Sequence, residues 1–99
     1  MTDLQNILAT LRALKPELRE LHGVRDLAVF GSRARNDADP DSDLDILVDF
    51  EPGATPTLFS LARLDALLEE ALGLRVDTVP RNSLNPRYRE FVEQDLVRV

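Results

Sequence analysis

The sequence predicts one α/β (α+β) domain, in which a small mixed sheet of about three to four strands packs against helices. Three observations support this fold class. The chain of 99 residues has the size of a single domain. Hydrophobic residues make up 43% of it, which is enough to form one core. Leucine-rich stretches with helical spacing alternate along the chain with short apolar runs of strand length.

The N-terminal region, residues 1–22, is expected to be helical. Thr2 or Asp3 can cap a first helix, and Pro16 either breaks that helix or begins a second short one. Gly23 follows as a residue suited to the end of a helix. We therefore expect a helical hairpin or a kinked helix, with apolar residues at helical spacing in its first part: Leu4, Ile7, Leu8, Leu11 and Leu14.

The rest of the chain alternates between strands and helices. Three apolar segments predict strands, at residues 24–30, 43–50 and 74–79. Two further helices are expected, one over 58–72 that Thr57 caps and Gly73 ends, and one over 87–95. Turn-forming residues predict loops at 36–42, between Pro52 and Pro56, and at 80–86. A short tail suited to an extended conformation occupies residues 96–99.

Composition excludes several classes of function. The chain has 18 acidic and 12 basic residues, a formal net charge of −6. Because non-specific nucleic-acid binding depends on phosphate neutralisation by Lys and Arg, direct binding of nucleic acid is disfavoured. The absence of cysteine rules out disulfides, thiolate zinc sites and cysteine nucleophiles. With no apolar run of membrane-spanning length and no signal-type start, no membrane attachment is expected and the default location is the cytoplasm.

Two aspartates on the second predicted strand form the first candidate site. Asp43 and Asp45 point to one face of that strand, about 6.6 Å apart along the chain. Two carboxylates so placed can hold Mg²⁺ together with waters and substrate phosphates. Taken alone, the pair fits a solvent-facing strand surface equally well. The alternate positions of the strand are apolar and are expected to face the core: Leu44, Ile46, Val48 and Phe50.

Asp77, on the third predicted strand, strengthens the metal-site hypothesis. Aspartate is depleted in central strands. If this strand pairs beside the second, all three carboxylates can face one position. Asp77 can then complete the metal shell or act as a general base toward an attacking hydroxyl. The alternative for Asp77 by itself is an edge-strand side chain in water.

The dipeptide Gly31-Ser32 closes the first predicted strand and supplies a candidate phosphate site. Glycine lets a triphosphate approach the backbone N–H groups closely. Ser32 can cap a short following helix or donate its hydroxyl to phosphate. Arg33 and Arg35 follow, and both can neutralise phosphate or the nearby acids. The alternatives are an ordinary strand-to-turn dipeptide and two solvated arginines.

The spacing of these residues resembles a known signature. The segment 31–45, GSRARNDADPDSDLD, followed by Asp77 on a later strand, is similar to the nucleotidyltransferase signature of the polymerase-beta superfamily. It looks most like the MNT, or minimal nucleotidyltransferase, group, and the likeness covers nearly the whole chain. One departure is Asn36, where relatives commonly have glycine, and asparagine also tolerates a left-handed backbone.

The resemblance implies a polymerase-beta-like fold and one nucleotidyltransferase domain over residues 1–99. Its N-terminal helices would lie at 1–22, its catalytic core at 24–79, and its C-terminal helix and tail at 80–99. The implied reaction transfers AMP from ATP to a hydroxyl with two Mg²⁺ ions as cofactor. The residues implied to be catalytic and metal-binding are Asp43, Asp45 and Asp77. Those implied to bind the nucleotide are Gly31, Ser32, Arg33, Arg35 and Ser42.

The resemblance also implies a partner. Members similar to this chain are typically encoded beside a HEPN-type toxin, and the MNT protein acts as the antitoxin by transferring AMP to a tyrosine of that toxin. A HEPN-family partner and a hetero-oligomer are therefore expected. Two alternatives stay open: a non-catalytic subunit that neutralises its partner by occlusion, and a nucleotide sensor without a partner.

Three other features are assigned no function. The alternating aspartates from Asp37 to Asp45 suggest a calcium loop, but an EF-hand needs Gly and Glu at fixed loop positions, and neither possible register supplies them. His22 suits a helix end, where a cationic side chain complements the helix dipole. Tyr88 is expected to be packed or exposed rather than modified by the protein itself.

Overall fold

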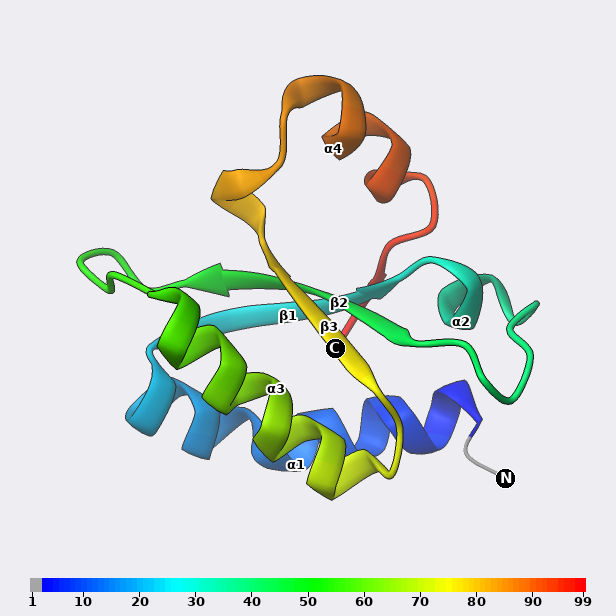
Figure 1. Ribbon diagram of the computed structural model, residues 1–99, viewed down its shortest axis with the longest axis horizontal. Coiled ribbons are helices and arrows are strands. Elements are labelled where there is room, and N and C mark those ends of the chain that lie inside the picture. The colour runs from blue at the N-terminus through cyan, green and yellow to red at the C-terminus, as the bar shows by residue number, and fades with distance from the viewer. Residues whose placement is uncertain (1–2) are drawn as a thin grey trace.

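Figure 1 shows the computed structural model, which describes residues 3–99 as a mixed four-stranded sheet with helices on both faces. The strands are β1 (Val24–Phe30), β2 (Leu44–Phe50), β3 (Val76–Pro80) and β4 (Val97–Arg98), in the order β3-β2-β1-β4. β1 pairs antiparallel with β2 and with β4, whereas β2 and β3 are parallel. The predicted fold class is confirmed, and the second and third strands pair as expected.

Helices cover the two faces of the sheet unequally. α1 (Leu4–His22) and α3 (Leu58–Leu72) lie together against one face, and α4 (Pro86–Glu93) lies on the other (Figure 1). A short helix, α2 (Ser32–Arg35), directly follows β1, and a 3₁₀ turn, Arg81–Ser83, follows β3. Within residues 3–99, no helix is both long and apolar enough to cross a bilayer.

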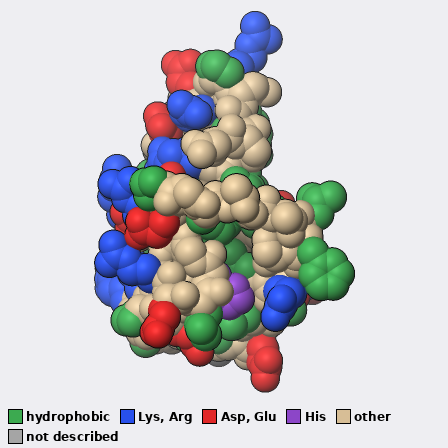
Figure 2. All heavy atoms as spheres, turned by 90° about the vertical axis from the view of Figure 1, so that its left-hand side faces the viewer, with side chains coloured by type: hydrophobic (Ala, Val, Ile, Leu, Met, Phe, Trp, Pro, Cys, Tyr) green, Lys and Arg blue, Asp and Glu red, His purple; other side chains and the backbone are tan. Residues whose placement is uncertain are grey.

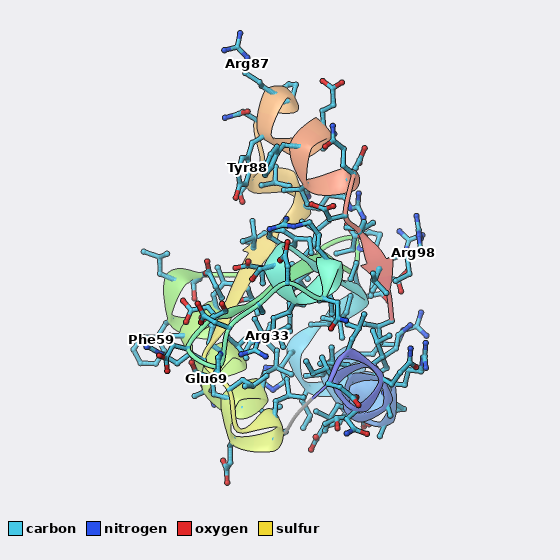
Figure 3. All side chains as sticks on the ribbon, turned by 90° about the vertical axis from the view of Figure 1, so that its right-hand side faces the viewer. Arg33, Phe59, Glu69, Arg87, Tyr88 and Arg98 are labelled. Atoms are coloured by element: carbon cyan, nitrogen blue, oxygen red, sulfur yellow. The ribbon has the colours of Figure 1, made fainter. Side chains whose placement is uncertain are left out.

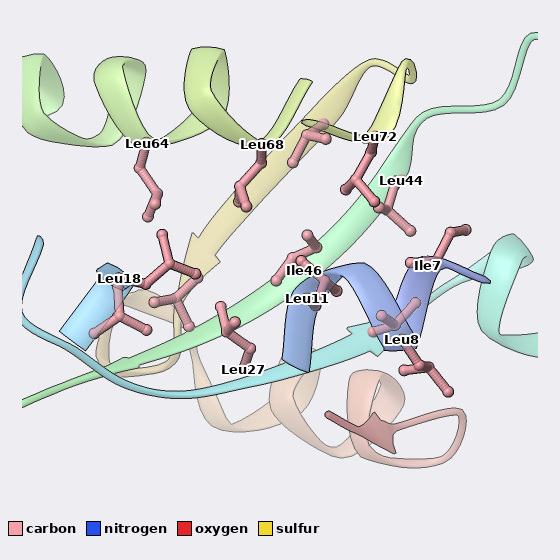
Figure 4. Packing of buried hydrophobic residues seen from close by; sticks show 14 residues of the cluster. Ile7, Leu8, Leu11, Leu18, Leu27, Leu44, Ile46, Leu64, Leu68 and Leu72 are labelled. Carbon is pink, nitrogen blue, oxygen red and sulfur yellow. The ribbon is translucent and has the colours of Figure 1, made fainter. Parts of the chain in front are cut away.

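The main core lies between the sheet and helices α1 and α3 (Figure 4). Alternate residues of β2 enter it because side-chain direction reverses at each residue of a strand. The helices contribute apolar stripes spaced by three and four residues. Burying one such leucine contributes about 1.5–3 kcal/mol, so this layer fixes both helices on the sheet. Its most deeply buried members are Ile7, Leu11, Leu18, Val29, Leu44, Ile46, Val48, Leu64 and Leu68.

A smaller apolar cluster occupies the opposite face of the sheet. Val92 of α4, with Leu84 before that helix, covers apolar side chains of β1 and β2: Ala28, Phe30 and Leu47. Leu47 lies two residues after Asp45 on β2, so both side chains point to this face. α4 therefore shares a face of the sheet with the candidate site.

α1 is one continuous helix with Pro16 inside it, so of the two arrangements expected, a helical hairpin or a kinked helix, the hairpin is wrong. Pro16 lies inside the helix on its exposed side. A proline removes one backbone hydrogen bond, here to the carbonyl of Arg12, and water can satisfy a carbonyl on that side. Leu11 and Leu18, on either side of the proline, are fully buried and hold both halves of the helix against the sheet.

The other boundaries agree with the sequence analysis to within two residues. The carboxylate of Asp3 caps α1 by accepting from the N–H of Asn6 at 2.9 Å, whereas Thr2 lies outside the described residues. Thr57 caps α3 as expected. β3 begins at Val76 rather than at residue 74, and α4 ends at Glu93 rather than at residue 95.

Candidate active site

Three aspartates lie where the parallel strands β2 and β3 begin. Asp45 is paired in register with Asp77. Residues paired across neighbouring strands point to the same face, so both carboxylates lie on the face opposite the main core. Asp43 directly precedes β2. The sheet topology thus brings the three acids selected from the sequence to one end of the sheet.

The electrostatics of Asp45 show that these carboxylates act on one another. Burial raises the pKa of Asp45 most, the negative charges of Asp77 and Asp43 raise it further, and Arg35 opposes them. A cation beside these side chains would offset that repulsion.

Gly31 lies directly against the Asp45 carboxylate. Its φ of 77° and ψ of −157° fall in a region that is essentially restricted to glycine. A Cβ at this position would lie 2.5 Å from Oδ2 of Asp45. The bend after β1 therefore needs glycine both for its backbone and for its contact with the acid. Gly31 also occupies the N-cap position of α2, so the sequence-based assignment of that cap to Ser32 is wrong.

The Arg33 side chain is engaged with the loop that precedes β2. Its Nε and Nη2 donate to the carbonyl of Ser42 at 3.2 and 2.8 Å. The Ser42 hydroxyl in turn donates to the Asp39 carboxylate at 3.2 Å. Two of the predicted nucleotide ligands, Arg33 and Ser42, therefore hold the loop that leads into Asp43 against α2.

Arg35 joins α2 to the segment after α4. Its guanidinium pairs with Asp95 at 2.9 Å and with Asp37 at 3.1 Å. Hydrogen bonds to Asp95 and then to Asp37 raise the pKa of Arg35. The helix ends at Asn36, whose φ of 63° is the left-handed conformation that asparagine tolerates.

Asp43 is turned toward solvent and Arg75. Its Oδ1 lies 3.7 Å from Nε of Arg75, and 54% of the side chain is exposed. As the side chains of residues 3–99 stand, no three acidic or histidine groups are close enough together to hold a metal ion. The candidate ligands Asp43, Asp45 and Asp77 nevertheless all offer carboxylate oxygens, which suit a hard cation such as Mg²⁺. Asp43 would exchange Arg75 for the cation.

Asp65 is a further acidic residue beside the cluster, and it is not among the candidates selected from the sequence. From α3 it accepts hydrogen bonds from the Thr78 N–H at 3.2 Å and the Thr78 hydroxyl at 2.5 Å. Burial is the main cause that raises the pKa of Asp65, Thr78 lowers it, and Asp77 and then Glu69 raise it. An acid on the apolar stripe of α3, between Leu64 and Leu68, is the sequence signal that could have identified it.

His22 and Tyr88, to which the sequence assigned no function, lie at the end of α1 and on α4. His22 ends α1 at the end of the molecule remote from α2, where Figure 2 shows the histidine in purple. Tyr88 is exposed on α4 (Figure 3) and stacks with Phe91, with a ring-centroid distance of 6.3 Å.

Residues 11–99 match the nucleotidyltransferase domain family, and the chain belongs to that family in its minimal, MNT-type group. It is 46% identical over 99 residues to the protein adenylyltransferase MntA of Thermococcus cleftensis, and this match covers 100% of the chain and 98% of that protein. The match therefore extends over nearly the whole length of that relative.

Solved structures with the same fold include two of note. A protein provisionally described as a minimal nucleotidyltransferase superposes with a TM-score of 0.80 at 44% identity, covering 99% of this chain and 97% of that one. The second is a complex of a tri-AMPylated HEPN toxin of Shewanella oneidensis with an MNT antitoxin. The match has a TM-score of 0.67 at 20% identity and covers 93% of this chain and 70% of that one. At that identity the second match shows the fold alone.

Proposed function

We propose that this chain transfers AMP from ATP to a tyrosine hydroxyl of a HEPN-type partner and thereby acts as the partner's antitoxin. The observation that carries the proposal is the in-register pair Asp45 and Asp77, with Asp45 lying against the bend at Gly31. The name of the Thermococcus relative, a protein adenylyltransferase, supports AMP as the transferred group. The AMP-modified HEPN toxin in the Shewanella complex supports the choice of partner.

The roles of the three aspartates follow from their positions. Asp43, Asp45 and Asp77 would hold Mg²⁺, which when bound stabilises charge on the attacking and leaving oxygens. Asp77, the more exposed member of the in-register pair, accepts the proton of the acceptor hydroxyl. The acceptor oxygen then bonds to the α-phosphorus of ATP, and the bond from that phosphorus to pyrophosphate breaks.

The bend at residues 31–32 would hold the triphosphate. Gly31 presents backbone without a side chain beside Asp45, so phosphate oxygens can approach the carboxylates and the N–H groups of the bend together. Arg35 lies near enough to Asp45 to affect its titration and can offset phosphate charge from the same side. Arg33 and Ser42 contribute by fixing the loop before Asp43. The Arg33 guanidinium can bind phosphate only if it leaves the Ser42 carbonyl, and the Ser42 hydroxyl can donate to phosphate only if it leaves the Asp39 carboxylate.

A protein acceptor suits the architecture of the described residues. The described residues form one sheet with its covering helices and no separate unit that would position a polymer or a small acceptor. The acceptor hydroxyl therefore arrives on another molecule. Asp77 is exposed at the edge strand β3, where such a molecule can reach it.

The first test measures transfer of radiolabelled AMP to the co-purified HEPN-type partner with ATP and Mg²⁺. Asp45→Asn and Asp77→Asn are each expected to lower the transfer rate by about 100-fold or more, as removal of a group that stabilises transition-state charge does. Asp41→Asn is the matched control because it removes the same charge from the exposed loop nearby. The proposal is contradicted if the double variant Asp43→Asn, Asp45→Asn transfers AMP at the wild-type rate.

Intact mass of the partner separates catalysis from occlusion. A mass increase in multiples of one AMP group, lost in Asp77→Asn, indicates catalysis. Tight binding of the partner without a mass change indicates a subunit that neutralises its partner by covering it.

A further inference from the structure

Two outward N–H groups of the edge strand β3 donate to a helix instead of to another strand. β3 is the first strand in the sheet order, with β2 on one side only. An exposed strand edge normally leaves its outward N–H groups unpaired. Here the Val76 N–H donates to Oε2 of Glu69 at 3.0 Å, and the Thr78 N–H donates to Oδ1 of Asp65 at 3.2 Å. Both acceptors belong to α3, and Figure 3 shows Glu69 beside β3.

The spacing of the two acids matches the spacing of the two donors. Asp65 and Glu69 are four residues apart on a helix, which is about 6 Å along its axis. Val76 and Thr78 are two residues apart on a strand, which is about 6.6 Å. One turn of α3 therefore presents a carboxylate to each of two consecutive outward N–H groups of β3. A neutral apolar side chain at either helix position would leave a donor without a partner.

Asp77 lies between these two anchored donors. Its neighbours Val76 and Thr78 are held from outside by α3, and its own pairing with Asp45 holds it from inside. The hydroxyl of Thr78 adds a second bond to Asp65. The backbone on both sides of Asp77 is thus fixed against movement away from β2.

We propose that Asp65, assisted by Glu69, is a positioning residue for Asp77 and sets the distance between the Asp77 and Asp45 carboxylates. The proposal rests on the function proposed above only in naming the reaction that the placement serves. Asp65 itself does not touch the substrate. Its effect requires an oxygen acceptor at that position, not a negative charge.

The test compares Asp65→Leu, which removes the acceptor, with Asp65→Asn, which keeps an oxygen acceptor and removes the charge. Asp65→Leu is expected to lower kcat for AMP transfer about 10- to 100-fold, the loss typical when a group that orients a metal ligand is removed. The KM for ATP should stay unchanged because the bend at Gly31 is intact. Asp65→Asn should restore most of kcat. Glu70→Leu removes an exposed carboxylate from the same helix and should leave kcat unchanged.

Two further measurements test the positioning role without depending on AMP transfer. Hydrogen exchange of the Thr78 amide should be faster in Asp65→Leu than in wild type and should return to the wild-type rate in Asp65→Asn. The affinity for Mn²⁺, titrated by electron paramagnetic resonance, should fall in Asp65→Leu and be kept in Asp65→Asn. If Asp65→Leu does not fold, Thr78→Val removes only the hydroxyl bond and should lower kcat and Mn²⁺ affinity partially.

The outcomes distinguish this proposal from the proposed function. Wild-type kcat and Mn²⁺ affinity in Asp65→Leu would overturn it, as would an Asp65→Asn variant as impaired as Asp65→Leu. If the wild-type chain transfers no AMP to its partner, the proposed function fails. The Thr78 exchange rate and the Mn²⁺ affinity then decide the positioning role by themselves.

Discussion

Gly31 joins the backbone bend after β1 to the acidic cluster. Its backbone conformation is nearly exclusive to glycine, and its missing side chain leaves room for the carboxylate of Asp45. The sequence favours glycine here for close approach of phosphate. The structure adds a second reason, because the position that a Cβ would take is next to a catalytic candidate.

Gly31→Ala is expected to destabilise the fold by about 1–3 kcal/mol from backbone strain and to displace the Asp45 side chain. Gly73→Ala is the matched control: its φ is 69°, and a Cβ there would meet nothing within 4 Å. It should cost about 1–2 kcal/mol and leave the site intact. Urea unfolding measures stability, and AMP transfer measures the site. Equal transfer rates in the two variants would show that Asp45 need not lie against the bend.

The hydrogen-bond and ion-pair partners of the side chains at the site cannot be predicted from residue types alone. Arg33 and Ser42 have the residue types of nucleotide ligands, yet the Arg33 guanidinium donates to the Ser42 carbonyl and the Ser42 hydroxyl donates to Asp39. Arg75, which lies beside Asp43, carries no sequence signal that would link it to the site. Long flexible side chains have many possible partners, and only the fold selects among them.

α4 carries an exposed aromatic pair on the same face of the sheet as the carboxylates. Tyr88 and Phe91 are 46% and 60% exposed and stack with an interplanar angle of 20°. On the inner side of the helix, Val92 packs in the cluster that contains Leu47, two residues after Asp45. Exposed aromatic side chains are enriched at protein interfaces. This surface is therefore well placed to contact a partner whose acceptor reaches Asp77.

Phe91→Ser is expected to weaken binding of the proposed HEPN-type partner about tenfold or more, as loss of an aromatic anchor does. Phe59→Ser is the matched control, since Phe59 is also exposed but lies in the first turn of α3, at the end of the sheet where β2 finishes. Calorimetric titration of each variant with the partner gives the affinities. A larger loss with Phe59→Ser would place the interface at that other end.

α1 and the tail show how packing overrides local signals. Pro16 predicts a break, but burial of Leu11 and Leu18 keeps the helix on the sheet across it. The tail pairs as β4 because Val97 lies opposite Val29 on the free side of β1. Neither outcome follows from the residues of the element alone.

The order of the strands in the sheet affects the protonation of Asp45. Parallel pairing of β2 with β3 places Asp45 beside Asp77, and burial together with these neighbours raises the pKa of Asp45. The folded state then binds the Asp45 proton more tightly than the unfolded state does. Stability is therefore lost as the pH rises from about 3.9, the ordinary aspartate value, through the raised pKa.

Asp45→Asn is expected to increase the free energy of unfolding at pH 7, because it removes a half-buried charge that its neighbours repel. The difference from wild type should shrink as the pH falls through the raised pKa of Asp45, because the wild-type carboxyl then becomes protonated in the fold. Urea unfolding across this range measures both effects, with Asp41→Asn as the control for net charge. An Asp45→Asn variant less stable than wild type at pH 7 would mean that the carboxylate stabilises the fold.

The sequence by itself determined the α/β class, nearly all the strands and helices, and the identity of the acidic and glycine residues at the candidate site. These follow from periodicity, caps and spacing, which are local along the chain. Only the tertiary structure decided that Asp77 is in register with Asp45, that Gly31 touches Asp45, and that Asp65 and Glu69 anchor β3. These contacts join residues distant in sequence, and their geometry depends on how the helices pack on the sheet, which no local pattern encodes.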